Sequence, residues 1–77
     1  MQTELDVYPN PSSGKIFLKP TGSGNLNISD ISGKIIFSSE IQGHEVQEID
    51  LESWTKGIYF ISFSSGNQEM TEKLVVQ

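Results

Sequence analysis

Few side chains in this 77-residue sequence have the type and spacing that catalysis requires. The single histidine, His44, lies between Gly43 and Glu45 in an expected hairpin loop, where an imidazole is solvated rather than held as a general base. Cysteine is absent, and no serine stands in the Gly-x-Ser-x-Gly turn that exposes a nucleophile. A hydrolase would therefore lack both a base and a nucleophile, and we expect no enzymatic activity.

Three carboxylates, Asp30, Asp50 and Glu52, offer the oxygen ligands that calcium prefers, but no Asp-x-Asp-x-Asp-Gly loop gathers them. Charges on a solvated strand edge, where they resist unwanted strand pairing, are a commoner reason for such residues. The segments Gly22-Ser23-Gly24 and Ser64-Ser65-Gly66 lack the lysine and helix of a phosphate-binding loop. We expect neither a metal nor a cofactor.

Aromatic side chains could stack on sugar rings, as they do in carbohydrate-binding modules. Most of them fall at strand positions with core parity, which favours packing, whereas Trp54 lies in a loop and either covers the core or forms an exposed contact. An accessory β-sandwich that binds carbohydrate or mediates adhesion is therefore an alternative function, and exposed aromatics grouped around Trp54 would favour it. The aromatic set is Tyr8, Phe17, Phe37, Trp54, Tyr59, Phe60 and Phe63.

Charge and hydropathy exclude two classes of partner. Ten acidic residues against five basic ones give a net charge of −5, the wrong sign for neutralising the phosphates of a nucleic acid. No apolar run approaches the roughly 20 residues that cross a bilayer, so no membrane insertion is expected. Residues 1–20 also lack the apolar segment of a signal peptide, and we expect residues 1–77 to be a single domain and a fragment of something longer.

Turn-forming Gly, Pro, Ser and Asn clusters divide the chain at short intervals into segments with period-two alternation and β-branched or aromatic content. These segments predict strands at 4–8, 15–19, 25–30, 34–40, 45–51, 57–63 and 68–76. The apolar run 58–61 indicates a central strand, and the best helical candidate, 51–54, is at most one turn. The predicted fold is all-β, a seven-stranded antiparallel immunoglobulin-like β-sandwich, with a five-stranded barrel as second choice.

Four sequence blocks carry a resemblance to a known family. The first, Val7-Tyr8-Pro9-Asn10-Pro11-Ser12-Ser13-Gly14, resembles the Tyr-Pro-Asn-Pro-x-x-Gly opening of the type IX secretion system C-terminal sorting domain, or Por secretion tail. Asp30-Ile31-Ser32-Gly33-Lys34 resembles the family's Asp-x-x-Gly-Lys hairpin. Gly57-Ile58-Tyr59 matches its Gly-x-Tyr block, and Lys73-Leu74-Val75-Val76-Gln77 matches its terminal segment. Departures are Trp54, in place of a smaller aliphatic residue, and Gln77, in place of a basic one.

The resemblance implies that residues 1–77 are a C-terminal secretion signal from the end of a larger secreted protein. This signal directs the N-terminal cargo domain of the same parent chain across the outer membrane. In that family the outer-membrane translocon recognises the domain in the periplasm, and a surface sortase removes it, with the cargo left at the cell surface or outside the cell. Cleavage is expected near or before residue 4, and the terminal strand 69–76 is the expected contact, through strand addition. The residues expected to take part in translocon recognition are Tyr8, Pro9, Asn10, Pro11, Gly14, Asp30, Gly33, Lys34, Gly57, Tyr59, Lys73, Leu74, Val75 and Val76.

Overall fold

The computed structural model describes residues 5–9, 14–43 and 45–77, and every regular element in these ranges is a strand. In chain order the strands are β1 (Leu5–Tyr8), β2 (Lys15–Pro20), β3 (Gly24–Asp30), β4 (Ile35–Ile41), β5 (Gln47–Asp50), β6 (Gly57–Ser65) and β7 (Gln68–Val76). All seven expected strands are present, and their bounds differ from the expected ones by at most two residues. Residues 51–54 form a turn, in which the Trp54 N–H donates to the Leu51 carbonyl at 3.0 Å.

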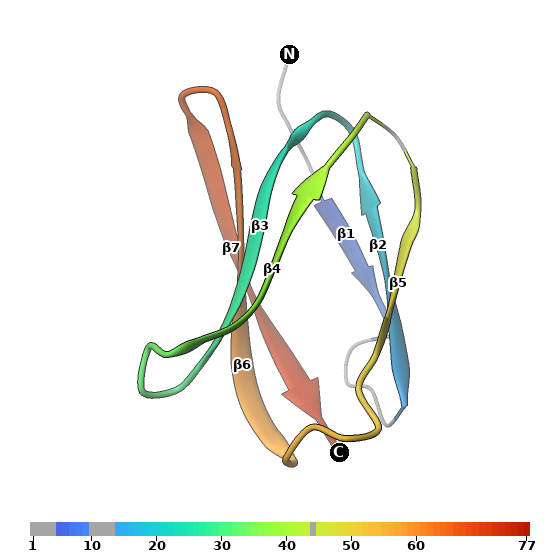
Figure 1. The fold of residues 1–77 in the computed structure, drawn as a ribbon, viewed down its shortest axis with the longest axis vertical. Helices are drawn as coiled ribbons and strands as arrows, with labels where there is room; N and C mark the ends of the chain where they lie inside the picture. Colours follow the sequence, from blue (N-terminus) through green and yellow to red (C-terminus); the bar gives the residue numbers. More distant parts are fainter. Residues whose placement is uncertain (1–4, 10–13, 44) are drawn as a thin grey trace.

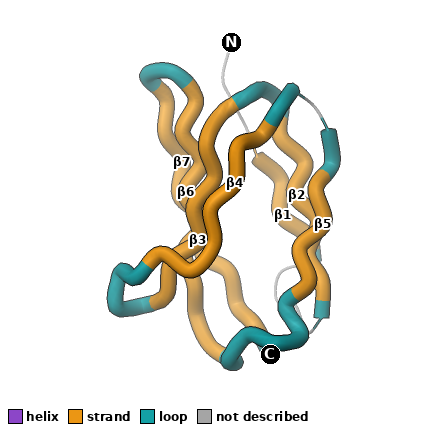
Figure 2. The backbone as a smooth tube through the Cα atoms, viewed as in Figure 1, coloured by secondary structure: helices purple, strands orange, loops and turns teal. Residues whose placement is uncertain are grey.

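The strands form two antiparallel sheets. One has the order β1-β2-β5 and the other the order β4-β3-β6-β7. The sheets face each other, with the connecting loops gathered at the two ends of the molecule (Figures 1 and 2). The prediction of seven antiparallel strands is confirmed. The separate sheets of three and four strands are consistent with a sandwich and not with the five-stranded barrel. No described residue belongs to a helix of the length and apolarity that spanning a membrane demands.

Alternation along each strand supplies the core between the sheets. In β2 every second side chain is buried, and in β3 Leu26 and Ile28 are buried while the residues next to them are not, as the period of two requires. In β5 Ile49 faces inward and Glu48 faces solvent. Strand β6 lies between β3 and β7, so its central position is confirmed. The core comprises Leu5, Ile16, Leu18, Leu26, Ile28, Ile41, Ile49, Leu51, Tyr59, Ile61, Phe63, Leu74 and Val76.

Some of the aromatic residues pack in or against the core, and others lie on the outer faces of the sheets. Among the described aromatics, Tyr59 and Phe63 are buried, whereas Tyr8 and Phe60 are 44% and 38% exposed. Phe17 lies on the outer face of β2, because its buried neighbours Ile16 and Leu18 occupy the inner face. The prediction of core packing therefore holds for Tyr59 and Phe63, and Phe37 and Trp54 pack against the core. It fails for Tyr8, Phe17 and Phe60, because these side chains have the opposite parity on their strands.

Candidate functional site

The blocks that carry the family resemblance converge on one end of the sandwich. In the three-stranded sheet β1 ends where β2 begins and β5 ends, with Tyr8 opposite Phe17 and Lys15 opposite Asp50. In the four-stranded sheet β3 and β7 end where β4 and β6 begin. Figure 1 shows these strand ends in the lower half of the molecule, where the C-terminus also lies, with the β3–β4 turn projecting to the left. We call this end, with Tyr8–Pro9, Gly14, 30–34, 57–59 and 73–76, the motif end.

A tight turn at the motif end is organised by Asp30. Its Oδ1 accepts hydrogen bonds from the Ser32 hydroxyl at 2.6 Å, the Ser32 N–H at 2.9 Å and the Lys34 N–H at 3.0 Å. The Gly33 N–H donates to the Asp30 carbonyl at 3.0 Å, and Gly33 has a φ of 90°. The side-chain bond from Ser32, followed by the backbone bond from Lys34, lowers the pKa of Asp30. The hairpin expected from the Asp-x-x-Gly-Lys block is present, and glycine suits position 33 because it adopts that φ without steric cost.

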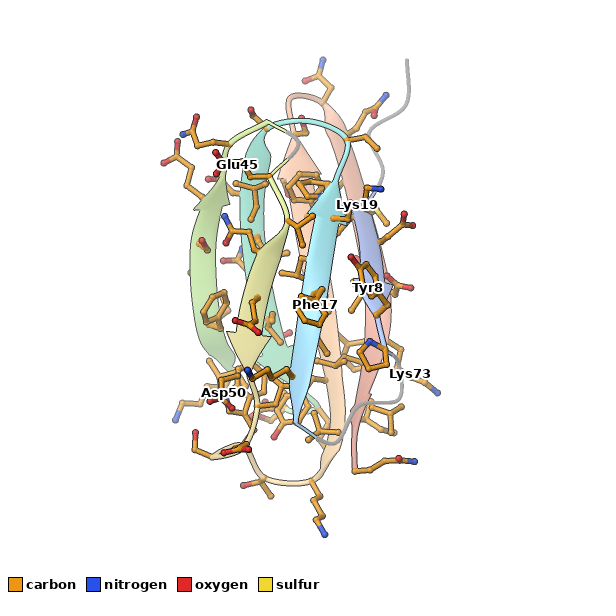
Figure 3. All side chains as sticks on the ribbon, turned by 90° about the vertical axis from the view of Figure 1, so that its right-hand side faces the viewer. Tyr8, Phe17, Lys19, Glu45, Asp50 and Lys73 are labelled. Carbon is orange, nitrogen blue, oxygen red and sulfur yellow. The ribbon has the colours of Figure 1, made fainter. Side chains whose placement is uncertain are left out.

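The Tyr-Pro corner leaves β1 on the outer face of the three-stranded sheet. The Tyr8 ring stacks on Phe17, with ring centroids 5.7 Å apart and an interplanar angle of 27°, and both rings stand on that face in Figure 3. Pro9 is exposed and follows a cis peptide bond. The carbonyl of Gly14 accepts a 2.6 Å hydrogen bond from the Leu51 N–H, which ties the start of β2 to the end of β5. Asn10 and Pro11 lie outside the described residues.

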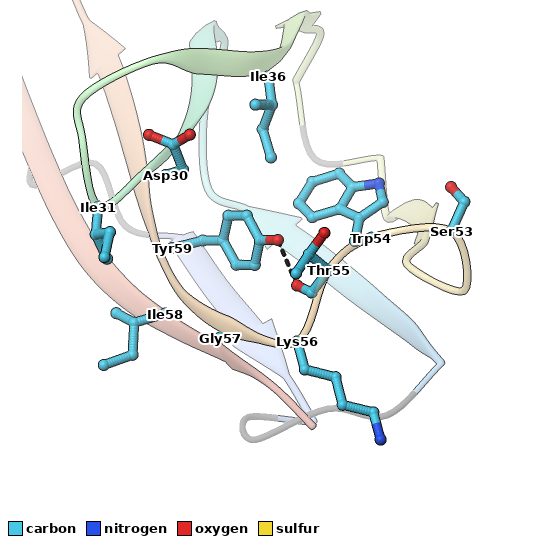
Figure 4. A pocket seen from close by; sticks show the side chains of 10 residues that line it. All are labelled: Asp30, Ile31, Ile36, Ser53, Trp54, Thr55, Lys56, Gly57, Ile58 and Tyr59. Atoms are coloured by element: carbon cyan, nitrogen blue, oxygen red, sulfur yellow. Dashed lines mark hydrogen bonds between the residues drawn. The ribbon is translucent and has the colours of Figure 1, made fainter.

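An open hollow of about 530 Å³ lies between the Asp30 turn and the start of β6. Trp54 and Tyr59 form its floor, with ring centroids 5.2 Å apart, and the Tyr59 hydroxyl donates to the Thr55 carbonyl (Figure 4). Trp54 is half-buried and packs against the core, so it covers the interior at this end. The exposed aromatics Tyr8 and Phe60 do not line the hollow, so the grouping that would favour a carbohydrate site is not present. Its lining is Asp30, Ile31, Ile36, Ser53, Trp54, Thr55, Lys56, Gly57, Ile58 and Tyr59.

Strand β7 joins the motif end to the core. Leu74 and Val76 are 0% and 5% exposed and lie opposite Tyr59 and Gly57 of β6, while Lys73 and Val75 alternate to the outer face. Of the predicted recognition residues in this strand, Leu74 and Val76 therefore fill the interior. In the described part of the four-stranded sheet β7 forms one edge, and β4 forms the other.

The carboxylates considered as calcium ligands are used locally. The Asp30 carboxylate closes its own turn, and Asp50 Oδ1 accepts the Glu52 N–H at 2.9 Å. Within residues 5–9, 14–43 and 45–77 no group of three metal-binding side chains comes together. Glu72 behaves differently: its Oε2 is buried and finds no hydrogen-bond partner among the described residues. Burial, and then the charge of Asp6, raises the pKa of Glu72.

The sequence interpretation missed the hollow and the apolar side chains around it. Ile31, Ile36 and Ile58 line the hollow, and all three are exposed. A signal was present, because Ile58 and Phe60 alternate against the core residues Tyr59 and Ile61 and so have to face outward. The apolar pair Ile35-Ile36, next to a turn, likewise cannot place both side chains on one face of a strand.

Comparison with known proteins accounts for the ordered motifs. Residues 6–77 match the family described as the secretion system C-terminal sorting domain. An endo-acting ulvan lyase of Formosa agariphila is 31% identical over 80 residues, in an alignment that covers 100% of this chain and 16% of the relative. The chain thus spans a small part of the length of that relative. Membership implies recognition by the secretion machinery and secretion to the cell surface or beyond. The chain belongs to the C-terminal sorting domains of the type IX secretion system, and is a non-catalytic module that acts as a secretion signal.

Proposed function

We propose that the motif end is the surface by which the type IX outer-membrane translocon recognises this domain. The observation that carries the proposal is the convergence of four separate sequence blocks on one end of a sandwich 34 Å long. Core packing alone does not require such blocks to meet at the surface. Tyr8, Pro9, Asn10, Pro11, Gly14, Asp30, Gly33, Lys34, Gly57, Lys73 and Val75 are the proposed contact residues, and Tyr59, Leu74 and Val76 support them from the interior.

The proposed route follows from this role. The domain recruits the translocon while its parent protein is in the periplasm, and the cargo domain that precedes it in the same chain crosses the outer membrane with it. A surface sortase then cleaves near or before residue 4 and leaves the cargo at the cell surface or in the medium. No nucleic acid or inserted membrane segment takes part, which agrees with the net charge of −5.

We further infer that the sandwich is immunoglobulin-like. The orders β1-β2-β5 and β3-β6-β7 correspond to strands A-B-E and C-F-G of that fold. The fourth strand differs, because in the constant-type arrangement it joins the first sheet beside the fifth strand, whereas β4 pairs with β3. The proposed topology is thus an immunoglobulin-like sandwich in which strand four has changed sheets.

Export of a reporter tests the proposed function. Residues 1–77 are fused to the C-terminus of a periplasmic reporter that carries its own signal peptide, in strains with and without a working type IX translocon. Surface or extracellular reporter is expected in the first strain only. Equal periplasmic retention in both strains would refute the proposal.

A further inference from the structure

Exposed apolar side chains are concentrated at one corner of the motif end. Of the seven exposed large hydrophobics among the described residues, five lie in the β3–β4 turn, at the start of β4 or at the start of β6. The other two, Tyr8 and Val46, lie elsewhere. Contiguous exposed apolar surface on a small soluble domain marks an interaction site. We call the five residues the isoleucine corner: Ile31, Ile35, Ile36, Ile58 and Phe60.

Strand register makes this corner continuous. Ser29 of β3 lies opposite both Ile35 and Phe60, so these two residues stand on the strands at either side of it. The β3–β4 register shifts at this point, and Ile35 and Ile36 are both exposed. Ile58 stands on the same face of β6, two residues before Phe60. Ile31, 76% exposed, follows Asp30, which is the Cα partner of Tyr59. Figure 4 shows Ile31 and Ile58 on one side of the hollow and Ile36 with Trp54 on the other.

Two lysines, Lys34 and Lys56, lie around the corner beside a single carboxylate, Asp30, although the domain as a whole carries −5. Lys56 lines the hollow, and Lys34 closes the Asp30 turn. The only carboxylate of the lining, Asp30, is occupied by three hydrogen bonds from its own turn. The ion pair found among the described residues joins Lys15 to Glu48 at 3.3 Å, and neither Lys34 nor Lys56 has such a partner there.

We propose that the isoleucine corner is the docking surface for a protein segment of the secretion machinery that carries apolar side chains flanked by carboxylates. This inference rests on the proposed function and deepens it, since it names the surface and the chemistry of the partner. One apolar side chain of the segment enters the hollow over Trp54, and its neighbours cover Ile58 and Phe60. Its carboxylates lie near Lys34 and Lys56, where complementary charge sets register and partner choice.

Two other occupants fit the observations less well. A domain of charge −5 is repelled by an anionic membrane surface, and two nearby lysines are too few to reverse that. A second copy related by a two-fold axis would place the same patch against itself. Lys34 and Lys56 of both copies would then meet, and the nearby Asp30 carboxylates already accept hydrogen bonds within their own turns.

Peptide binding tests the chemistry, with Trp54 as the reporter because it is the only tryptophan in the sequence. The probes are a short synthetic peptide that alternates leucine with glutamate and a matched peptide with lysine in place of glutamate. The acidic peptide is expected to change Trp54 fluorescence and to bind at least about tenfold more tightly than the basic one. Raised salt should weaken its binding. Equal affinity for both peptides would overturn the proposal.

Matched variants locate the binding surface. The pair Ile31→Thr and Ile58→Thr, which keeps β-branching, should weaken binding of the acidic peptide about tenfold, whereas Val46→Thr at the opposite end should leave it unchanged. Lys34→Gln with Lys56→Gln should remove most of the salt dependence, with Lys19→Gln as control. Vesicles of phosphatidylglycerol and sedimentation of the free domain probe the other occupants. Vesicle binding or dimerisation that the isoleucine variants abolish would overturn the proposal.

Export separates this inference from the proposed function. In the reporter fusion the Ile31→Thr and Ile58→Thr pair should lower surface display about tenfold, while Val46→Thr retains it and circular dichroism shows all three domains folded. If the wild-type domain gives no translocon-dependent export, the proposed function fails. If the wild type is exported and a folded isoleucine variant is exported equally well, the docking surface alone is refuted.

Discussion

Asp30 holds its turn through both its backbone and its side chain. Its backbone carbonyl accepts the Gly33 N–H, and its side chain accepts three further bonds from Ser32 and Lys34. Aspartate suits such a turn because its short carboxylate reaches the N–H groups of residues that follow it. The turn in turn presents Ile31, the most exposed of the large apolar residues. The Asp30 side chain thus stabilises the conformation of the turn that presents Ile31.

The charge of Asp30 should stabilise the turn in a pH-dependent way. Its pKa in the folded protein lies below the ordinary 3.8, so its contribution is complete above that value and is lost as the pH falls through the lowered pKa. We expect Asp30→Asn to lower the melting temperature at neutral pH, and the difference from wild type to disappear in strong acid. Thermal melts of both proteins across this range measure it. A difference that is the same at every pH would show that the charge contributes nothing.

Glu72 should have the opposite effect. Its pKa is raised above the ordinary 4.5, so its ionisation opposes folding, and the penalty vanishes as the pH falls below that value. We expect Glu72→Gln to raise the free energy of unfolding at neutral pH by less than about 1 kcal/mol, because solvent screens a half-exposed side chain. Denaturant unfolding measures the gain, and Glu69→Gln, at an exposed position of the same strand, is the control. An equal gain at pH 4 would contradict the assignment.

At the scale of elements, β7 serves the core and the motif end together. Leu74 and Val76 face the interior, so deleting residues 73–77 removes two core side chains along with the terminal motif. Truncating one fully buried leucine costs about 2–5 kcal/mol, and the whole domain has only about 5–15. We therefore expect the deletion to unfold the domain as well as abolish export. Loss of the β-sheet signal in circular dichroism checks this, and a folded truncated domain would contradict it.

Strands β3 and β6 approach closely at Gly24. A Cβ atom at this position would lie 2.2 Å from the Ser64 carbonyl oxygen and 3.0 Å from the Phe63 ring. Backbone cannot give way as a flexible side chain can, so Gly24→Ala should destabilise the domain by about 1–3 kcal/mol or more. Chemical denaturation measures the loss, with Asn25→Ala, at an exposed neighbour, as the control. A wild-type midpoint for Gly24→Ala would show that the strands separate freely.

Local patterns predicted the elements well, for identifiable reasons. Alternation gives the burial of β2 and β3 directly, and the Asp-x-x-Gly-Lys block gives the turn at Gly33. The pairing of β2 with β5 could not be predicted, because it joins residues far apart in the chain. The same limit hid the candidate site: Ile36 and Trp54 meet at the hollow only through that tertiary arrangement. Asn10 and Pro11 remain predictions, since they lie outside the described residues.

At the scale of the whole molecule, the two ends are unlike. The motif end carries the sequence blocks and the isoleucine corner. At the opposite end the Ser23 Oγ accepts the Gly43 N–H at 2.7 Å, and the Ser23 carbonyl accepts the Ser65 hydroxyl at 2.5 Å. These bonds join the β2–β3 connection to the β4–β5 connection and to the last residue of β6, and these positions lie outside the family blocks. The proposed recognition surface and the hydrogen bonds of Ser23 thus lie at opposite ends of the long axis.

Loop insertion should reveal this polarity. A short Gly-Ser insertion between Gly66 and Asn67 lengthens a hairpin at the opposite end, at a cost of about 1 kcal/mol in loop-closure entropy, and export of a fused reporter should persist. The same insertion between Ser32 and Gly33 has a similar entropic cost but breaks the Asp30 turn, and export should fall sharply. Surface display measures both, with melts to verify folding. Equal export of the two would show that the ends are equivalent.

The direction of β1 has a mechanical consequence. Leu5 pairs with Pro20, the last residue of β2. Strand β1 therefore starts at the end opposite the motif end and runs toward it. A domain joined ahead of Leu5 is therefore attached at the end of the sandwich opposite the motif end. A large cargo domain would then leave the motif end uncovered, and one small domain could direct the export of cargo of very different sizes.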